Sequence, residues 1–133
     1  MQTFLPYPSF HASAAALDYR RLGNQRVECK QILKALHVGG GWSNHPATKM
    51  WQGYEKALSV YYNCIVNEWV DRGYKNNMPT LAVGVLYSFE LPPWLGNEEF
   101  HASHRSNLLR KAPEFYGKYE WKEADDLPYV WPV

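Results

Sequence analysis

The strongest constraint on the fold is a run of large apolar residues between Trp51 and Trp69. They recur at alternating spacings of three and four, the period of one face of an α-helix, and the set is Trp51, Tyr54, Leu58, Tyr61, Ile65 and Trp69. Ser43 or Asn44 can cap this helix, and Gly73 stands just past its last turn. The pattern predicts a helix of roughly seven turns, long enough to be the central strut of a small bundle.

Two further helices are expected on either side of this strut. Residues 11–37 combine an alanine run with an apolar stripe, have one possible interruption at Gly23, and end at the glycines of VGGGW. Asn97, followed by two glutamates, is typical of a helix start, and that helix should end before Pro113. The stretch LAVGVLYSF, residues 81–89, is the only one that could form a strand. The predicted class is therefore all-α.

Both ends of the sequence are expected to be extended. Prolines in MQTFLPYPSF remove donors and disfavour helix, and the tail PEFYGKYEWKEADDLPYVWPV is rich in proline and aromatic residues. With 133 residues and 46% hydrophobic composition, we expect residues 1–133 to form one compact domain. Cys29 and Cys64 form no CxxC motif and are interpreted as small buried hydrophobes.

Composition limits the classes of partner. No apolar run approaches a membrane span, and the start does not resemble a secretory signal, so a cytoplasmic location and no membrane contact are expected. The net charge is only +1, so binding to nucleic acid would depend on a local basic patch. Aromatic residues make up 16% and can fill a core or stack on bases.

The first candidate constellation is YRRLGNQRVECK, residues 19–30. On a helix its four cations cannot all face the core, so a basic face with Glu28 embedded in it is expected; the cations are Arg20, Arg21, Arg26 and Lys30. The carboxylate could position an arginine or act as an acid or base. An ordinary solvated face with ion pairs is the alternative.

The second constellation is FHASHRSNLLRK, residues 100–111. Spacings of three and four place donors on adjacent ridges that suit a phosphate; they are His101, His104, Arg105, Arg110 and Lys111. A metal shared by the two histidines is a weaker alternative because local spacing provides no third ligand, and a plain helix surface is another. No metal or cofactor is predicted.

A third candidate is His45 in WSNHP, just ahead of a predicted helix. It could help exposed amides to bind an anion, or it could simply cap the helix. The sequence contains no GxSxG motif, no phosphate-binding Walker loop and no zinc-type cysteine spacing.

Several of these segments together resemble the pyrimidine-dimer DNA glycosylases of phages and bacteria. MQTFLPYPSF is similar to the start of the bacterial members, and LDYRRLGNQRVE aligns with the first helix so that Glu28 falls on the catalytic glutamate. HPATKMWQGYEKALSVYYNCIVNEWVDRGY is similar to the long helix of the family. HRSNLLRKAPEFYGKY matches its closing pattern of a basic pair, a proline and clustered aromatics.

The resemblance implies a helical fold with an N-terminal segment threaded between helices. It implies that the Met1 α-amine attacks the sugar C1′, forms a Schiff base and cleaves the strand by β-elimination, assisted by Glu28. An α-amine suits this task because its ordinary pKa, about 7.7 to 8.0, leaves a neutral fraction near pH 7. The basic residues of both constellations would contact phosphates, and the stacking surfaces would be Tyr116, Tyr119 and Trp121.

The chain departs from the family at three positions. Gln2 follows the initiator methionine, so Met1 should be retained; Thr3 stands where a basic residue is usual, and Val27 replaces the arginine before the glutamate. Missing charges reduce affinity for long duplex DNA. Two other functions therefore remain open: a non-catalytic relative that binds a nucleotide or small signalling nucleotide, and a protein-interaction module that docks through its aromatic tail. The sequence does not indicate the oligomeric state.

Overall fold

The computed structural model describes residues 1–83 and 89–133. Six helices follow in order: α1 (Phe10–Ala16), α2 (Tyr19–Val38), α3 (Pro46–Lys49), α4 (Glu55–Asp71), α5 (Glu98–Lys111) and α6 (Pro113–Tyr116), with a 3-10 turn at Gly117–Tyr119. Within these ranges no residue lies in a strand, which confirms the all-α class. The candidate strand at residues 81–89 includes residues 84–88, which lie outside the described part. Among the described helices, none is both long and apolar enough to cross a bilayer.

The expected helix over 11–37 is in fact two helices, α1 and α2. Leu17 is fully buried in an extended conformation, and its carbonyl accepts a 2.7 Å hydrogen bond from Arg72. Asp18 is also extended, and its N–H donates to the Tyr116 hydroxyl. These distant partners satisfy the backbone groups at the break, so the chain can turn there. Helix α2 continues through Gly23 and ends at Gly39, whose φ is 74°.

The predicted seven-turn helix is also wrong in extent, because residues 50–54 interrupt it. Gly53 adopts φ 87°, a left-handed conformation that glycine tolerates, and Tyr54 then caps α4. The apolar period continues across the break because Trp51 is buried in the same core as the α4 stripe. His45, rather than Ser43 or Asn44, caps α3, and Gly73 ends α4 as predicted.

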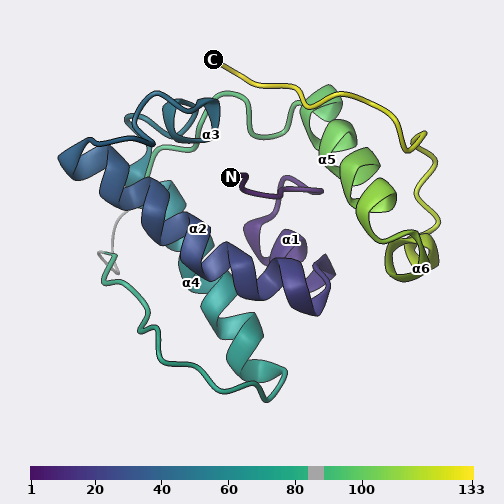
Figure 1. Ribbon diagram of the computed structural model, residues 1–133, viewed down its shortest axis with the longest axis horizontal. Coiled ribbons are helices and arrows are strands. Elements are labelled where there is room, and N and C mark those ends of the chain that lie inside the picture. Colours follow the sequence, from purple (N-terminus) through teal and green to yellow (C-terminus); the bar gives the residue numbers. More distant parts are fainter. Residues whose placement is uncertain (84–88) are drawn as a thin grey trace.

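Helices α2 and α4 pack on each other, and α5 lies apart from them (Figure 1). The N-terminal segment, residues 1–6, lies in the middle of the molecule between α2 and α5 (Figure 1). Gln2 to Pro6 are all buried. The core is therefore closed by a segment with no helical hydrogen bonds of its own, whose backbone polar groups need side-chain partners.

Helix α2 provides the first set of these partners. The Gln25 amide accepts a hydrogen bond from the Phe4 N–H at 2.9 Å and donates to the Gln2 carbonyl at 2.7 Å. The Tyr61 hydroxyl of α4 donates to the Phe4 carbonyl. The Gln25 side-chain amide has both a donor and an acceptor, so it can form the pair of hydrogen bonds that a neighbouring β-strand would otherwise provide to an extended segment.

Helix α5 provides the second set. The Leu5 N–H donates to Nδ1 of His104 at 2.8 Å, and Nδ1 of His101 bonds to the Leu5 carbonyl at 2.8 Å. Arg105 donates to the Pro6 carbonyl at 2.8 Å. Because the Gly96 N–H donates to Nε2 of His101, the proton of that ring lies on Nδ1. We call these three side chains, with Gln25, the N-terminal clamp.

After α5 the chain forms α6 and the 3-10 turn, which the prediction of an extended tail missed. From residue 121 the tail is extended and runs back along α5 (Figure 1). The Val130 N–H donates to Ser103, and the Asn107 side chain donates to the Leu127 carbonyl. The tail therefore reaches the N-terminal end of α5 and comes close to the chain's first residues.

Candidate functional site

A cavity of about 460 Å³ opens where the N-terminal segment, α2, the end of α5 and the tail meet. Its wall contains an acid, three cations, the chain's first residue and two rings of the tail; the lining residues are Met1, Gln2, Phe4, Arg20, Arg21, Asn24, Glu28, Lys111, Tyr129 and Trp131. On α2 these residues recur at spacings of three and four, so they share one face of the helix.

Among the described residues that line this cavity, Glu28 is the only carboxylate. Burial raises its pKa above the ordinary value, and this effect exceeds the opposing effects of the N-terminal ammonium, the Gln2 N–H, Gln25 and Lys111. A carboxyl group whose pKa is raised exchanges protons more readily near neutral pH. Glu28 can therefore act as a proton donor or acceptor in this position.

Gln25 fixes the position of Glu28 relative to the N-terminal segment. Its amide nitrogen donates to Glu28 at 2.8 Å and to the Gln2 carbonyl. Met1 and Glu28 consequently face one cavity, and among the described residues no ion pair joins the Met1 amine to an acid. Met1 is half-buried, and the charge of its ammonium opposes the rise in the pKa of Glu28.

Three of the predicted phosphate contacts surround the same opening. Arg20 and Lys111 are exposed, and Arg21 forms a 3.1 Å ion pair with Asp18. Arg20 and Arg21 come from α2, the helix that carries Glu28, and Lys111 comes from the end of α5. Such cations can neutralise the phosphates that flank a bound nucleotide.

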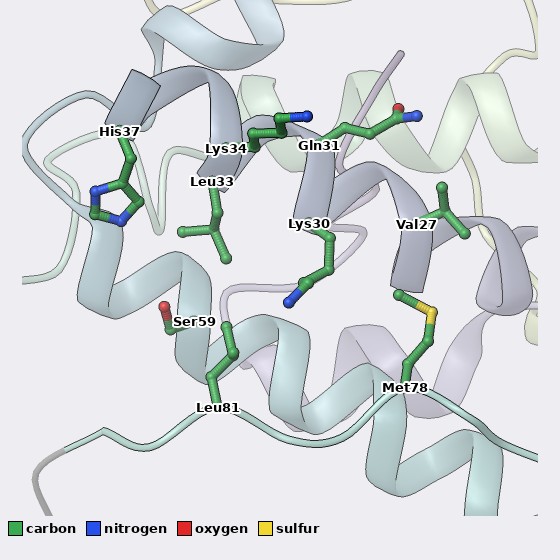
Figure 2. A pocket seen from close by; sticks show the side chains of 9 residues that line it. All are labelled: Val27, Lys30, Gln31, Leu33, Lys34, His37, Ser59, Met78 and Leu81. Atoms are coloured by element: carbon green, nitrogen blue, oxygen red, sulfur yellow. The ribbon is translucent and has the colours of Figure 1, made fainter. Parts of the chain in front are cut away.

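Other predicted contacts lie elsewhere. Arg26 lies over the Trp69 ring at 4.1 Å and donates to Asn76. Lys30 extends from α2 into a separate cavity of about 490 Å³ beside residues 78–81 (Figure 2). Arg110 is exposed but bonds to Asn107 and to the Asp125 carbonyl. The structure does not bring these three together with Glu28, and their contacts with phosphate stay predictions.

The structure contradicts a phosphate role for His101, His104 and Arg105. Both histidines have no exposed surface, and Arg105 is 8% exposed. Arg105 is held in ion pairs with Glu98 and Glu123. All three belong to the N-terminal clamp and bond to the N-terminal segment, although Nε2 of His104 is buried without a hydrogen-bond partner among the described residues.

His45 adopts the simpler of its two predicted roles. Its Nδ1 accepts the Ala47 N–H at 3.0 Å, which caps α3. The ring packs edge-on against Trp131, a lining residue of the cavity, at 5.9 Å. His45 supports the cavity wall rather than lining it.

The predicted stacking residues face each other instead of the cavity. Tyr116 is fully buried and donates to Asp18, and Trp121 stacks on it at 5.6 Å and on Tyr119 at 5.1 Å. Tyr116 has no exposed ring to offer a substrate, and a stacking role for the partly buried Tyr119 and Trp121 stays a prediction. The rings of the tail that line the cavity are Tyr129 and Trp131, which lie 5.5 Å apart, and Phe4 of the N-terminal segment lines it as well.

Sequence reasoning missed the cavity roles of Tyr129 and Trp131, and of Gln25. The alternation of rings in PYVWPV was a usable signal, because alternate side chains of an extended segment point the same way. Two of the three family departures also have a definite place in the structure. Thr3 is buried and accepts from Trp51 Nε1, whereas Val27 is exposed and lies outside the cavity wall.

The buried histidines give the fold a defined pH dependence. Burial lowers the pKa of His104 to about 3 and also lowers that of His101. The unfolded chain binds these protons near pH 6.5 but the folded chain does not, so folding is favoured above pH 6.5 and weakened as the pH falls toward 3. Between pH 7 and pH 5 we expect His104 alone to remove about 2 kcal/mol of unfolding free energy.

Urea unfolding at a series of pH values would measure this loss. His104→Asn keeps an acceptor for Leu5 but cannot titrate, so it should flatten the slope even though it lowers the stability. Equal unfolding free energies at pH 7 and pH 5 for the unaltered protein would contradict neutral, buried histidines.

In the described part of the chain, no three His, Cys, Asp or Glu side chains are placed to hold a metal ion together. The chemistry available at the cavity is that of an amine, a carboxyl group and surrounding cations. An amine and a carboxyl group that face one opening can take part in nucleophilic and acid–base chemistry.

The comparisons with known proteins identify the family. A model of the pyrimidine dimer DNA glycosylase family matches residues 1–81, more than half of the 133-residue chain. The chain belongs to this family, as the resemblance in its sequence indicated. No curated protein and no solved structure matches the chain significantly.

The family supports a DNA glycosylase-type function with DNA as the substrate. The matched span contains the N-terminal segment, Glu28 and helices α1 to α4. The remaining wall of the cavity, formed by Lys111, Tyr129 and Trp131, lies outside it.

Proposed function

We propose that the protein is a DNA glycosylase with associated abasic-site lyase activity on damaged or modified pyrimidines. The observation that carries the proposal is that Met1 and Glu28 face one cavity ringed by cations. The α-amine of Met1 would be the nucleophile, and Glu28 would be the acid and base. Arg20, Arg21 and Lys111 would contact the phosphates of the bound strand.

The first stage of the reaction would release the base and join the protein to the sugar through an imine. The neutral amine attacks the sugar C1′, and the bond from C1′ to the base breaks, so the base departs with the bonding electrons and takes up a proton. The attacking nitrogen loses a proton, and the sugar ring opens as its oxygen gains one, which leaves an imine between C1′ and the amine. A carboxyl group with a raised pKa can serve both transfers.

Strand cleavage follows from the imine. Removal of a proton from C2′ forms a C2′–C3′ double bond and expels the 3′ phosphate, and water then hydrolyses the imine to free the amine. Tyr129 and Trp131 line the cavity. They would contact the extruded base, or fill the gap that this base leaves in the duplex.

Borohydride trapping tests the nucleophile. Borohydride reduces the imine to a stable amine, so the protein should become covalently attached to an oligonucleotide that contains an abasic site. Mass spectrometry of the digested adduct should place the added sugar on the peptide that begins with Met1. Protein acetylated at its α-amine is the control and should give no adduct.

Two outcomes would contradict the proposal. One is the absence of an adduct under conditions that trap another member of the family. The other is an adduct that maps to a lysine, because the Met1 amine would then not be the nucleophile.

The second candidate is a non-catalytic protein that binds a nucleotide in the same cavity. It is favoured by the net charge of +1 and by a cavity volume in the range of small-molecule sites. Thermal unfolding with a panel of nucleotides would reveal it as a rise in midpoint without any trapping. The protein-interaction alternative gains less support, because Trp121 of the tail packs on the chain itself and donates to the Tyr7 hydroxyl.

A further inference from the structure

A second cavity, of about 570 Å³, adjoins the Glu28 cavity along α2. Arg20 and Asn24 line both cavities. The other lining residues come from α2 and from the end of α4: Tyr19, Gly23, Arg26, Val27 and Trp69. A strand bound at Glu28 that continued along α2 would therefore enter this second cavity.

The floor of the second cavity is an exposed aromatic surface. Tyr19 is 54% exposed and stacks on Trp69, with ring centroids 5.3 Å apart and planes 23° apart. Tyr74 packs against both rings, at 4.8 and 4.6 Å. We call these three residues the aromatic plate. It holds Tyr19 in a fixed orientation while leaving most of that side chain open to solvent.

Gly23 allows the plate to lie against α2. A Cβ at this position would lie 3.0 Å from the Trp69 ring, a contact so tight that the ring would have to shift, and glycine avoids it. The glycine is otherwise unfavourable in the middle of a helix. Its position is explained by the close approach of Trp69.

The charges of the second cavity are of one sign. Its described lining residues include Arg20 and Arg26 and no carboxylate. Arg26 lies over the Trp69 ring, and Arg20 forms no ion pair with any described residue. Cations beside an exposed ring are what a nucleotide requires, since its phosphate needs donors and its base needs a flat apolar surface.

We propose that the aromatic plate, with Arg20 and Arg26, is a subsite for the nucleotide next to the target, whose base leaves the helical stack and lies on Tyr19. The proposal rests on the proposed function, because it assumes that the target nucleotide occupies the Glu28 cavity. Stacking on an aromatic ring tolerates any base. The subsite therefore selects DNA that is already opened beside the target, and not a particular sequence.

A thermodynamic cycle between Tyr19 and the neighbouring base tests the subsite. Oligonucleotides carry a non-cleavable tetrahydrofuran abasic site, with the base on its 5′ or 3′ side either present or removed. For the unaltered protein, removal on one side should weaken binding by about 5- to 150-fold, the usual effect of one stacked base. In Tyr19→Ala the same removal should have no further effect.

Two control variants test whether the effect depends on the aromatic ring of Tyr19. Tyr19→Phe keeps the ring and should bind like the unaltered protein. Leu91→Ala removes a side chain of equal exposure, 55%, that lines neither cavity, and should retain full sensitivity to the missing base.

The outcomes separate this proposal from the one on which it rests. The subsite alone would be overturned if the protein binds the oligonucleotide and is trapped at Met1, but the losses of binding from Tyr19→Ala and from base removal simply add. This additivity would have to hold for the base on the 5′ side and for the base on the 3′ side. Failure of the unaltered protein to bind the abasic oligonucleotide or to be trapped would overturn both.

Discussion

Replacing Glu28 by Gln should abolish strand cleavage and leave binding to abasic DNA almost unchanged. The amide has the same shape and can still contact Gln25, but it can neither accept nor donate the proton that each step of the proposed reaction transfers. General acid–base catalysis typically contributes about 10²- to 10⁴-fold, so the single-turnover rate should fall by that factor. Rates and dissociation constants would be measured on the same oligonucleotide.

Glu99→Gln is the matched control. Glu99 is an exposed glutamate in the first turn of α5 and lies outside the Glu28 cavity, so its loss should change neither the rate nor the affinity. A Glu28→Gln protein that cleaves at the normal rate would remove Glu28 from the mechanism. A variant that no longer binds would instead show that the carboxylate shapes the cavity.

Replacing Arg105 by Ala should lower the unfolding free energy by about 1–3 kcal/mol, the usual cost of leaving a buried acceptor without its donor. Arg105 donates to Glu123 at 2.9 Å, pairs with Glu98 and holds the Pro6 carbonyl. Its removal leaves Glu123 and a buried carbonyl without their partner. Urea unfolding at pH 7 would measure the loss.

Arg110→Ala provides the comparison on the same helix. Arg110 is exposed, and its contacts with Asn107 and Asp125 lie at the surface, so the expected change is below about 1 kcal/mol. If Arg105→Ala kept its full stability but bound DNA more weakly, Arg105 would be a phosphate contact after all.

The helices were largely predictable because their signals are local. Glycines terminate α2 and α4 at Gly39 and Gly73, and Asn97 caps α5 through its side chain as expected. The break at Leu17 was not predictable. It depends on Arg72, which lies 55 residues away and satisfies the carbonyl exposed by the break. Long-range partners of this kind have no signature within a sequence window.

The candidate site was predictable in part. The segment 19–30 correctly placed Glu28 on a face with Arg20 and Arg21, because helical spacing alone fixes that face. The cluster on α5 was misassigned for a chemical reason. Carbonyl oxygens and phosphate oxygens accept hydrogen bonds from the same donors, so His101, His104 and Arg105 look alike in sequence whether they bind DNA or the chain's own backbone.

The N-terminal clamp also has a consequence for biogenesis. Leu5 is held by His104, 99 residues further along the chain, so the first residues cannot reach their final place until α5 has left the ribosome. Folding must therefore finish after most of the polypeptide has been translated. Until then the segment that carries the proposed nucleophile stays unburied, and an affinity tag fused ahead of Met1 would have to be accommodated at the Glu28 cavity.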